Sequence, residues 1–207
     1  MKVLLINGST HENGTTAAAL KIIADELKAQ GAESETVCLG TAAIHSCMGC
    51  MHCQKAGRCV FDDDPVNAVG EKVKNADGYI FAAPVHYASP AGAVVAFMDR
   101  LFYAYGKYMK FKPAASVVVA RRAGTTASYD VLNKYIQINS MLQVPSTYWN
   151  MVFGANAKDT EQDLEGATVM RAIASNTVWL IKLLENAKGT ALERPVLIDK
   201  VKTNFIR

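Results

Sequence analysis

Short apolar runs alternate with segments of helical periodicity along most of the chain. The runs are strand-sized, and the run at residues 115–120 is apolar at nearly every position, as expected of a strand covered on both faces. Between two runs, Leu20, Ile23 and Leu27 recur at helical spacing, and Gly31 is placed to end that helix. This alternation predicts a parallel sheet with helices on both sides.

The same pattern gives the element boundaries. The expected strands cover residues 3–6, 35–39, 78–83, 115–120 and 147–152, and the last is the weakest. The expected helices cover the segment around Leu20, residues 66–74, 91–105 and 129–142, and a long last helix marked by Val169, Ile173, Leu180, Ile181 and Leu184. We expect one domain over residues 1–189. Residues 190–207 leave two alternatives open, a segment that crosses a subunit boundary and a loosely attached tail.

Size and composition narrow the class of protein. A chain of 207 residues suits one domain, and its share of hydrophobic residues, 50%, is ordinary for a soluble globular protein. The net charge is only +3 and the basic residues are spread out, so we expect neither nucleic acid nor membrane as a partner. The apolar stretch after Met1 ends too early for a signal peptide, and no other apolar run is long enough to cross a membrane. We therefore expect a cytoplasmic protein.

The segment between the first expected strand and helix, residues 8–16, has the chemistry of an anion site. Backbone N–H groups at a helix N-terminus bind anions, and Gly8 and Gly14 permit a tight turn. The hydroxyl donors of the segment are Ser9, Thr10, Thr15 and Thr16. The spacing is neither G-x-G-x-x-G nor G-x-x-x-x-G-K-[ST], which disfavours a dinucleotide or a nucleoside triphosphate. A loop without a cation suits a single phosphate; the alternative is that these residues only cap the helix.

Two more loops follow expected strands at the same edge of the sheet, where ligands bind in open parallel sheets. After residues 78–83, Val85 and Tyr87 offer apolar and aromatic surface to a flat ring, or simply pack under the loop. After residues 115–120, Arg121 and Arg122 suit an anionic ring or a pyridine-nucleotide phosphate. A solvated surface pair is the alternative for the two arginines.

Four of the five cysteines form the pattern Cys47-x2-Cys50-x2-Cys53-x5-Cys59 after the second expected strand, on the same edge as these loops. Such a cluster points to a metal or redox site rather than a disulfide scaffold, and four thiolates satisfy a [4Fe–4S] cube. Zinc is an alternative, with His45 and His52 as further candidate ligands or as solvent-facing residues.

Two neighbouring features have plainer interpretations. Cys38 lies in an expected strand and is interpreted as a core residue. The acidic run at residues 62–64 is interpreted as a solvated helix start, with Asp64 as the cap and Pro65 at the first helical position.

Three segments together carry a family resemblance. The hydroxyl loop, the run A-A-P-V-H-Y-A-S-P-A at residues 82–91 and the triplet Met98-Asp99-Arg100 resemble the NADPH-dependent FMN reductase and flavodoxin-like superfamily, and most closely its iron–sulfur flavoprotein branch. The match runs to about residue 125. It implies a flavodoxin-like, doubly wound α/β fold with five parallel strands in the order 2-1-3-4-5. Asp99 and Arg100 look structural and are expected to pair with each other.

The resemblance also implies a site. The FMN phosphate would be held by Ser9, Thr10, Asn13, Thr15 and Thr16. The isoalloxazine would lie on Pro84, Val85, His86, Tyr87 and Ser89, with Arg122, Ala123 and Gly124 on a third side. In the iron–sulfur branch the compact cysteine motif holds a [4Fe–4S] cluster, and flavin-only members with similar cysteine loops keep both options open. The usual assembly is a homodimer or a pair of dimers, with the flavin near a subunit boundary.

Two functions follow as hypotheses. The first is an enzyme that reduces flavin, quinone or another small acceptor with NAD(P)H through bound FMN. The second is an electron carrier, fed by ferredoxin or a similar donor, with a cluster on the four cysteines. In both, the flavin carries the chemistry, so no catalytic side chain is assigned.

Overall fold

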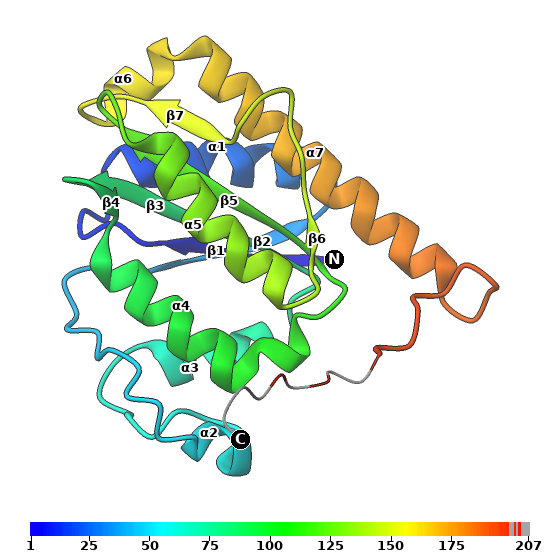
Figure 1. Cartoon of the computed structure of the whole chain (residues 1–207). Coiled ribbons are helices and arrows are strands. Elements are labelled where there is room, and N and C mark those ends of the chain that lie inside the picture. Colours follow the sequence, from blue (N-terminus) through cyan, green and yellow to red (C-terminus); the bar gives the residue numbers. More distant parts are fainter. Residues whose placement is uncertain (199–200, 202, 204–207) are drawn as a thin grey trace.

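A parallel sheet forms the centre of the computed structural model, which describes residues 1–198, 201 and 203 (Figure 1). Its main strands follow the spatial order β2-β1-β3-β5-β6. They are β1 (Lys2–Asn7), β2 (Glu33–Cys38), β3 (Gly78–His86), β5 (Pro113–Ala120) and β6 (Leu142–Gln143). All pairs along this path are parallel, which confirms the α/β architecture with crossover helices.

The expected count of five strands, with the order 2-1-3-4-5, does not hold as stated, because the described sheet has seven strands. Of the segment expected as the fifth strand, residues 147–152, only the last two residues lie in a strand, β7 (Met151–Phe153). β6 lies before that segment, and β6 and β7 pair with opposite ends of β5. Pro145 lies between them and has no N–H to donate to a ladder. The two-residue strand β4 (Ser89–Pro90) was not expected; it runs antiparallel to the end of β3.

Helices connect the strands and cover both faces of the sheet. They are α1 (Thr15–Ala29), α2 (His52–Ala56), α3 (Val66–Val73), α4 (Gly92–Tyr105), α5 (Thr125–Ile138), α6 (Ala157–Gln162) and α7 (Leu164–Ala187), with a 3-10 turn at Gly106–Tyr108. The prediction of a helix over 129–142 was four residues too late, since the chain leaves the helix at Asn139 and Ser140 has a φ of 55°. The short helices α2 and α6 were not predicted.

Two apolar cores follow from the strand alternation. Leu4 and Ile6 of β1 face α3, α4 and α5, whereas Val3 and Leu5 face α1 and α7. In Figure 1, α4 and α5 cross one face of the sheet and α1 lies behind it. The carboxyl ends of the parallel strands remain uncovered by this packing, so the loops that follow them are free to form a site.

Close packing between α3 and α4 depends on one glycine. A Cβ at Gly70 would lie 2.1 Å from the ring of Tyr105, which is buried. The Tyr105 hydroxyl donates to Asn67 Oδ1 at 3.2 Å, and Asn67 also accepts from the Cys59 N–H at 2.9 Å. The contact therefore connects the helix pair to the last cysteine of the motif.

The described end of the chain contacts the domain through Arg194, whose Cζ lies 5.2 Å from the centroid of the Phe111 ring. Residues 190–198 form neither helix nor strand, and Leu192, Val196 and Ile198 are exposed. The rest of the expected tail, residues 199–200, 202 and 204–207, lies outside the described residues. The domain boundary at residue 189 and the crossing of a subunit boundary stay predictions. None of the helices in the described part of the chain has the length and apolar character needed to cross a membrane.

Replacing Gly70 with alanine tests the α3–α4 contact. The added methyl group meets the Tyr105 ring, so we expect Gly70→Ala to lower the free energy of unfolding by about 1–3 kcal/mol in urea titrations. Gly92→Ala is the matched control, because a Cβ at Gly92 has no neighbour within 4 Å and alanine is the better helix former. Equal stability of the two variants would contradict this packing.

Candidate functional site

The carboxyl ends of β1, β3, β5 and β7 and the loops that follow them enclose an open cleft of about 620 Å³. It is lined by Ser9, His11, Glu12, Asn13, Gly14, Thr15, Thr16, Pro84, Val85, His86, Val119, Ala120, Arg121, Gly154, Ala155, Asn156 and Ala157. The cleft therefore brings together four segments that are far apart in the sequence, including parts of all three predicted loops.

The β1–α1 loop is held in shape by short polar contacts. Asn7 Oδ1 accepts from the Ser9 N–H at 3.0 Å, and Ser9 Oγ accepts from the His11 N–H at the same distance. The Gly8 N–H donates to Ala82 O at 2.8 Å, and a Cβ at Gly8 would lie 2.2 Å from Val94 Cγ2. Only glycine fits between β3 and α4 at this point, so the start of the loop is fixed by backbone contact.

The N-terminus of α1 opens into the cleft. Gly14 precedes the helix without a side-chain cap, while Thr15 and Thr16 line the cleft beside it. The first N–H groups of the helix, the helix dipole and two hydroxyls make a donor set that suits a phosphate group. The residues present thus fit the phosphate of FMN. Of the predicted phosphate contacts, Ser9, Asn13, Thr15 and Thr16 line the cleft and Thr10 does not.

The loop after β3 contributes Pro84, Val85 and His86 to the cleft, as predicted by position. Tyr87 is fully exposed at a left-handed φ of 59°, and neither it nor Ser89 lines the cleft. The hairpin formed by β4 explains this, because the chain reverses direction at residues 87–88.

The loop after β5 lies against the previous one. Gly124 has a φ of +89°, and a Cβ there would meet Val85 Cγ1 at 2.9 Å. Arg121 lines the cleft, whereas Arg122, Ala123 and Gly124, which were predicted to do so, are not among its lining residues. Whether Thr10, Tyr87, Ser89 and these three residues contact FMN stays a prediction.

Sequence reasoning missed a fourth wall, residues 154–157. Asn156 and Asp159 form a capping box at the start of α6, and the Gly154 N–H donates to Ala120 O at 3.0 Å. A Cβ at Gly154 would lie 3.2 Å from Thr15 Cγ2, which places this wall against the start of α1. The Asn-x-x-Asp spacing is the sequence signal that could have indicated a helix start here.

The cysteine motif lines a second, much smaller pocket of about 30 Å³. Its lining consists of the four motif cysteines and the residues Met48, Gly49, Met51, Val60, Phe61, Arg100 and Tyr103. The two pockets share no lining residue in the described part of the chain, so the cysteine pocket is separate from the flavin cleft within one chain. In Figure 1 the segment leaves β2 and runs around the outer side of α4 to α2 and α3.

The thiols of this pocket are free and unequally exposed. Cys47 and Cys50 are exposed, and Cys53 and Cys59 are half-buried. Burial raises the pKa of the Cys53 thiol, and the other three cysteines raise it further. Cys38 lies outside the pocket at the end of β2, where its thiol donates to Ser9 O at 3.6 Å.

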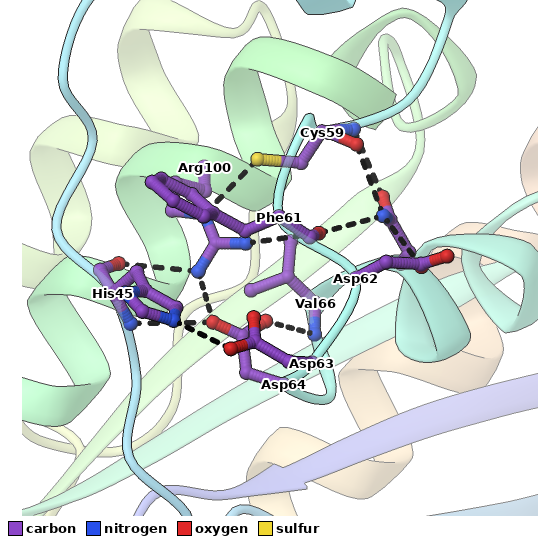
Figure 2. Close-up of polar contacts among 9 residues, drawn as sticks. His45, Cys59, Phe61, Asp62, Asp63, Asp64, Val66 and Arg100 are labelled. Carbon is purple, nitrogen blue, oxygen red and sulfur yellow. Dashed lines mark hydrogen bonds and ion pairs between the residues drawn. The ribbon is translucent and has the colours of Figure 1, made fainter.

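The predicted Asp99–Arg100 pair does not form. Arg100 instead pairs with Asp64 in a buried ion pair whose side chains are 1% and 0% exposed (Figure 2), and Asp99 accepts from the Tyr135 hydroxyl. The acidic run is therefore not simply solvated. Asp64 Oδ1 accepts from the Val66 N–H at 3.1 Å, but the N-cap of α3 is Pro65 and the helix begins at Val66, so both predicted positions are one residue too early.

Arg100 connects both ends of the cysteine segment. Its Nη1 donates to His45 O at 3.2 Å, its Nη2 to Phe61 O at 3.4 Å and its Nε to Cys59 Sγ at 3.1 Å. Burial opposes the charge of Arg100, but the bonds to Asp64 and Cys59 outweigh burial and raise the pKa of the guanidinium. The side chain is thus a fixed cation beside a cysteine sulfur.

His45, Asp63 and Asp64 are the one set in the described residues whose candidate metal-binding atoms lie within 4.8 Å of one another. His45 Nε2 lies 3.0 Å from Asp63 Oδ2, and the His45 ring stacks on Phe61. With Asp64 paired to Arg100, these side chains form a hydrogen-bond network rather than an open site.

A doubly wound sheet with an anion-binding loop at its carboxyl edge defines a flavodoxin-like, flavin-binding fold. The solved structure of RosB with the intermediate 8-demethyl-8-formylriboflavin-5'-phosphate shares this fold, with a TM-score of 0.73 and 16% identity over 100% of this chain and 93% of that one.

Sequence comparison agrees with the fold. An iron–sulfur flavoprotein of Methanocaldococcus jannaschii is 26% identical over 193 residues, covering 89% of this chain and 100% of the relative. Another, of Archaeoglobus fulgidus, is 31% identical over 147 residues, covering 70% and 72%. The model of the NADPH-dependent FMN reductase family matches residues 1–156. The chain belongs to this family, and it is an FMN-binding, flavin-dependent oxidoreductase.

Thr16 tests the phosphate end of the cleft. Thr16→Val keeps the shape of this buried residue but removes its hydroxyl, so we expect FMN to bind about 10- to 100-fold more weakly, with riboflavin binding unchanged. Thr168→Val is the matched control because Thr168 is exposed on α7 and does not line the cleft. Fluorescence titration of the apoprotein measures both affinities. An equal loss for FMN and riboflavin would contradict a phosphate contact.

The buried ion pair makes a separate prediction for stability. Arg100→Met leaves the Asp64 carboxylate buried without its partner, and we expect the free energy of unfolding to fall by about 3–5 kcal/mol. Arg58→Met removes the exposed pair with Asp62 and should have a much smaller effect. Urea unfolding of the two variants compares them directly. Similar losses would show that burial of the Arg100 pair is not what makes it stabilising.

Proposed function

We propose that the chain is an electron-transfer flavoprotein with FMN in the cleft and a [4Fe–4S] cluster on Cys47, Cys50, Cys53 and Cys59. The observation that carries this proposal is the convergence of all four motif cysteines on one pocket. Four thiolates are the ligand set of such a cluster. Two relatives that this chain matches over most of their length are named iron–sulfur flavoproteins, and these names support the same assignment.

The surroundings of the thiols suit a cluster. Most of the remaining lining is apolar, and Met51, Gly49 and Gly57 have left-handed φ values of 58°, 66° and 68° that turn the chain around the pocket. Left-handed conformations cost little at glycine, so the two glycines permit the tight wrapping that closely spaced ligands require.

When bound, FMN supplies hydride transfer and single-electron transfer, so it can connect a two-electron donor to a one-electron acceptor. The chain holds its phosphate on the N-terminus of α1 and offers Pro84 and Val85 as the surface for the ring. Arg121 places positive charge in the cleft, and exposed His86 is positioned to exchange protons with solvent. These roles need no nucleophile or paired carboxylates.

The open shape of the cleft favours a second function, the direct oxidation of NAD(P)H with flavin, quinone or another small acceptor. The cleft of about 620 Å³ is open to solvent, and Arg121 with the exposed Arg122 suits an anionic substrate. In the carrier function the donor is ferredoxin or a similar protein. A homodimer or pair of dimers would bring the cysteine pocket of one chain near the cleft of another.

The visible spectrum of protein purified without oxygen, with iron and sulfide assays, tests the proposal. We expect flavin bands with a broad shoulder and about four irons per chain. Cys59→Ser should lose iron and keep FMN, while Cys38→Ser, outside the pocket, should keep both.

The other outcomes separate the two functions. FMN without iron, together with rapid NAD(P)H oxidation, would contradict the carrier function. It would favour the reductase function, with cysteines that bind no cluster. A colourless protein that takes up no FMN would contradict the flavin site itself.

A further inference from the structure

We propose that Arg100 is a positioning residue for the cluster, which fixes the ligand Cys59 and raises the reduction potential through the bond from its Nε–H to Cys59 Sγ. This inference rests on the proposed function, because it requires a cluster in the cysteine pocket. It assigns a role to Arg100, which was expected from the sequence to pair with Asp99 and pairs with Asp64 instead.

The sulfur contact is part of a built arrangement (Figure 2). Arg100 Nε lies 3.1 Å from Cys59 Sγ, on a side chain that is 1% exposed. Arg100 comes from α4, whereas the groups that accept from it belong to the segment between β2 and α3. A rigid helix therefore presents the donor to a segment that has little regular structure of its own.

Three of the four other N–H donors of the guanidinium are engaged, from both Nη1 and Nη2, so its orientation is fixed. Nη1 meets Asp64 and His45 O, Nη2 meets Phe61 O, and the Phe61 ring centroid lies 5.1 Å from Cζ. A guanidinium is planar with its N–H groups in a fixed fork. Once Asp64 and the two carbonyls hold Nη1 and Nη2, Nε–H can point only toward Cys59.

Asp64 is itself held from the other side. Its Oδ1 accepts from the Val66 N–H at 3.1 Å, and its Oδ2 accepts from the His45 N–H at 3.2 Å. The ion pair brings no net charge to the pocket, so its effect on the cluster comes through the directed N–H bond rather than through bulk charge.

The Nε–H bond would raise the reduction potential of a cluster bound here by stabilising its reduced form. Reduction adds negative charge to the iron and its sulfur ligands, and a donor aimed at a ligand sulfur stabilises the reduced form more than the oxidised form. The effect is strengthened by the low polarity of the pocket, because Val60, Phe61 and Tyr103 line it around Cys59. Removing the donor should therefore make the cluster harder to reduce.

The test compares reduction potentials of anaerobically purified, FMN-loaded proteins. The wild-type protein, in which the Arg100–Asp64 pair has no net charge, is the reference. The double variant Asp64→Asn/Arg100→Met has no net charge at these positions either, because asparagine keeps an acceptor for Val66 without leaving a carboxylate buried, so it lacks the donor without a change in net charge. We expect its reduction equilibrium to lie about tenfold further toward the oxidised cluster, which is about 59 mV lower for one electron.

Two further variants separate the bond from other effects. Arg58→Met removes an exposed positive charge one residue from Cys59, and its potential should match the wild type if bulk charge is unimportant. Arg100→Lys keeps a cation for Asp64 but lacks the Nε donor, and should lower the potential even if the double variant does not fold. A folded, FMN-loaded double variant that loses iron would also support the role of Arg100 in placing Cys59.

The opposite results are distinct. If the double variant and Arg100→Lys keep their iron and the wild-type potential, Arg100 has only a structural role and the inference is overturned. If the wild-type protein holds FMN but no cluster, the proposed function fails, and this inference fails with it for a different and recognisable reason.

Discussion

The buried ion pair between Arg100 and Asp64 is the constraint on which the cysteine-bearing half of the structure depends. A charge removed from water requires a partner in good geometry, and here the partner comes from a different element of the fold. Because Arg100 also reaches His45 O and Phe61 O, α4 holds the segment at both ends of the cysteine motif. A segment with one short helix thereby acquires a defined shape, and the four thiols acquire a common pocket.

The flavin cleft depends on a different principle, the exposed carboxyl edge of a parallel sheet. Its walls are loops that follow buried strands, and each loop is located by backbone contact with its neighbour, as at Gly8, Gly124 and Gly154. α4 adjoins both sites: its N-terminal turn packs Val94 against Gly8, and Arg100 faces the cysteine pocket. At 1.5 Å per residue, these two positions are about 9 Å apart along the helix.

The sequence was informative where local chemistry decides the structure. The sequence predicted the apolar strands, the loop of glycines and hydroxyl residues at 8–16 and the grouping of the closely spaced cysteines. Each of these features depends on residues that are neighbours in the chain. The buried Arg100–Asp64 pair joins residues that are distant in the chain, so proximity in sequence pointed wrongly to Asp99. The separate pairing of β6 and β7 with β5 and the wall at residues 154–157 were missed for the same reason. Both depend on contacts with β5, which is distant in the chain.

The separation of the two pockets has an evolutionary consequence. The cysteine pocket and the flavin cleft share none of their described lining residues, and the cysteine segment is an excursion between β2 and α3 that leaves the sheet unchanged. Point substitutions in the thiols would therefore leave the flavin site intact, and a descendant chain would survive the loss as a simpler flavoprotein. If the cysteines hold the proposed cluster, the fold lets that cluster be inherited, lost or retuned independently of the flavin, with Arg100 as the residue whose conservation should follow that of the cysteines.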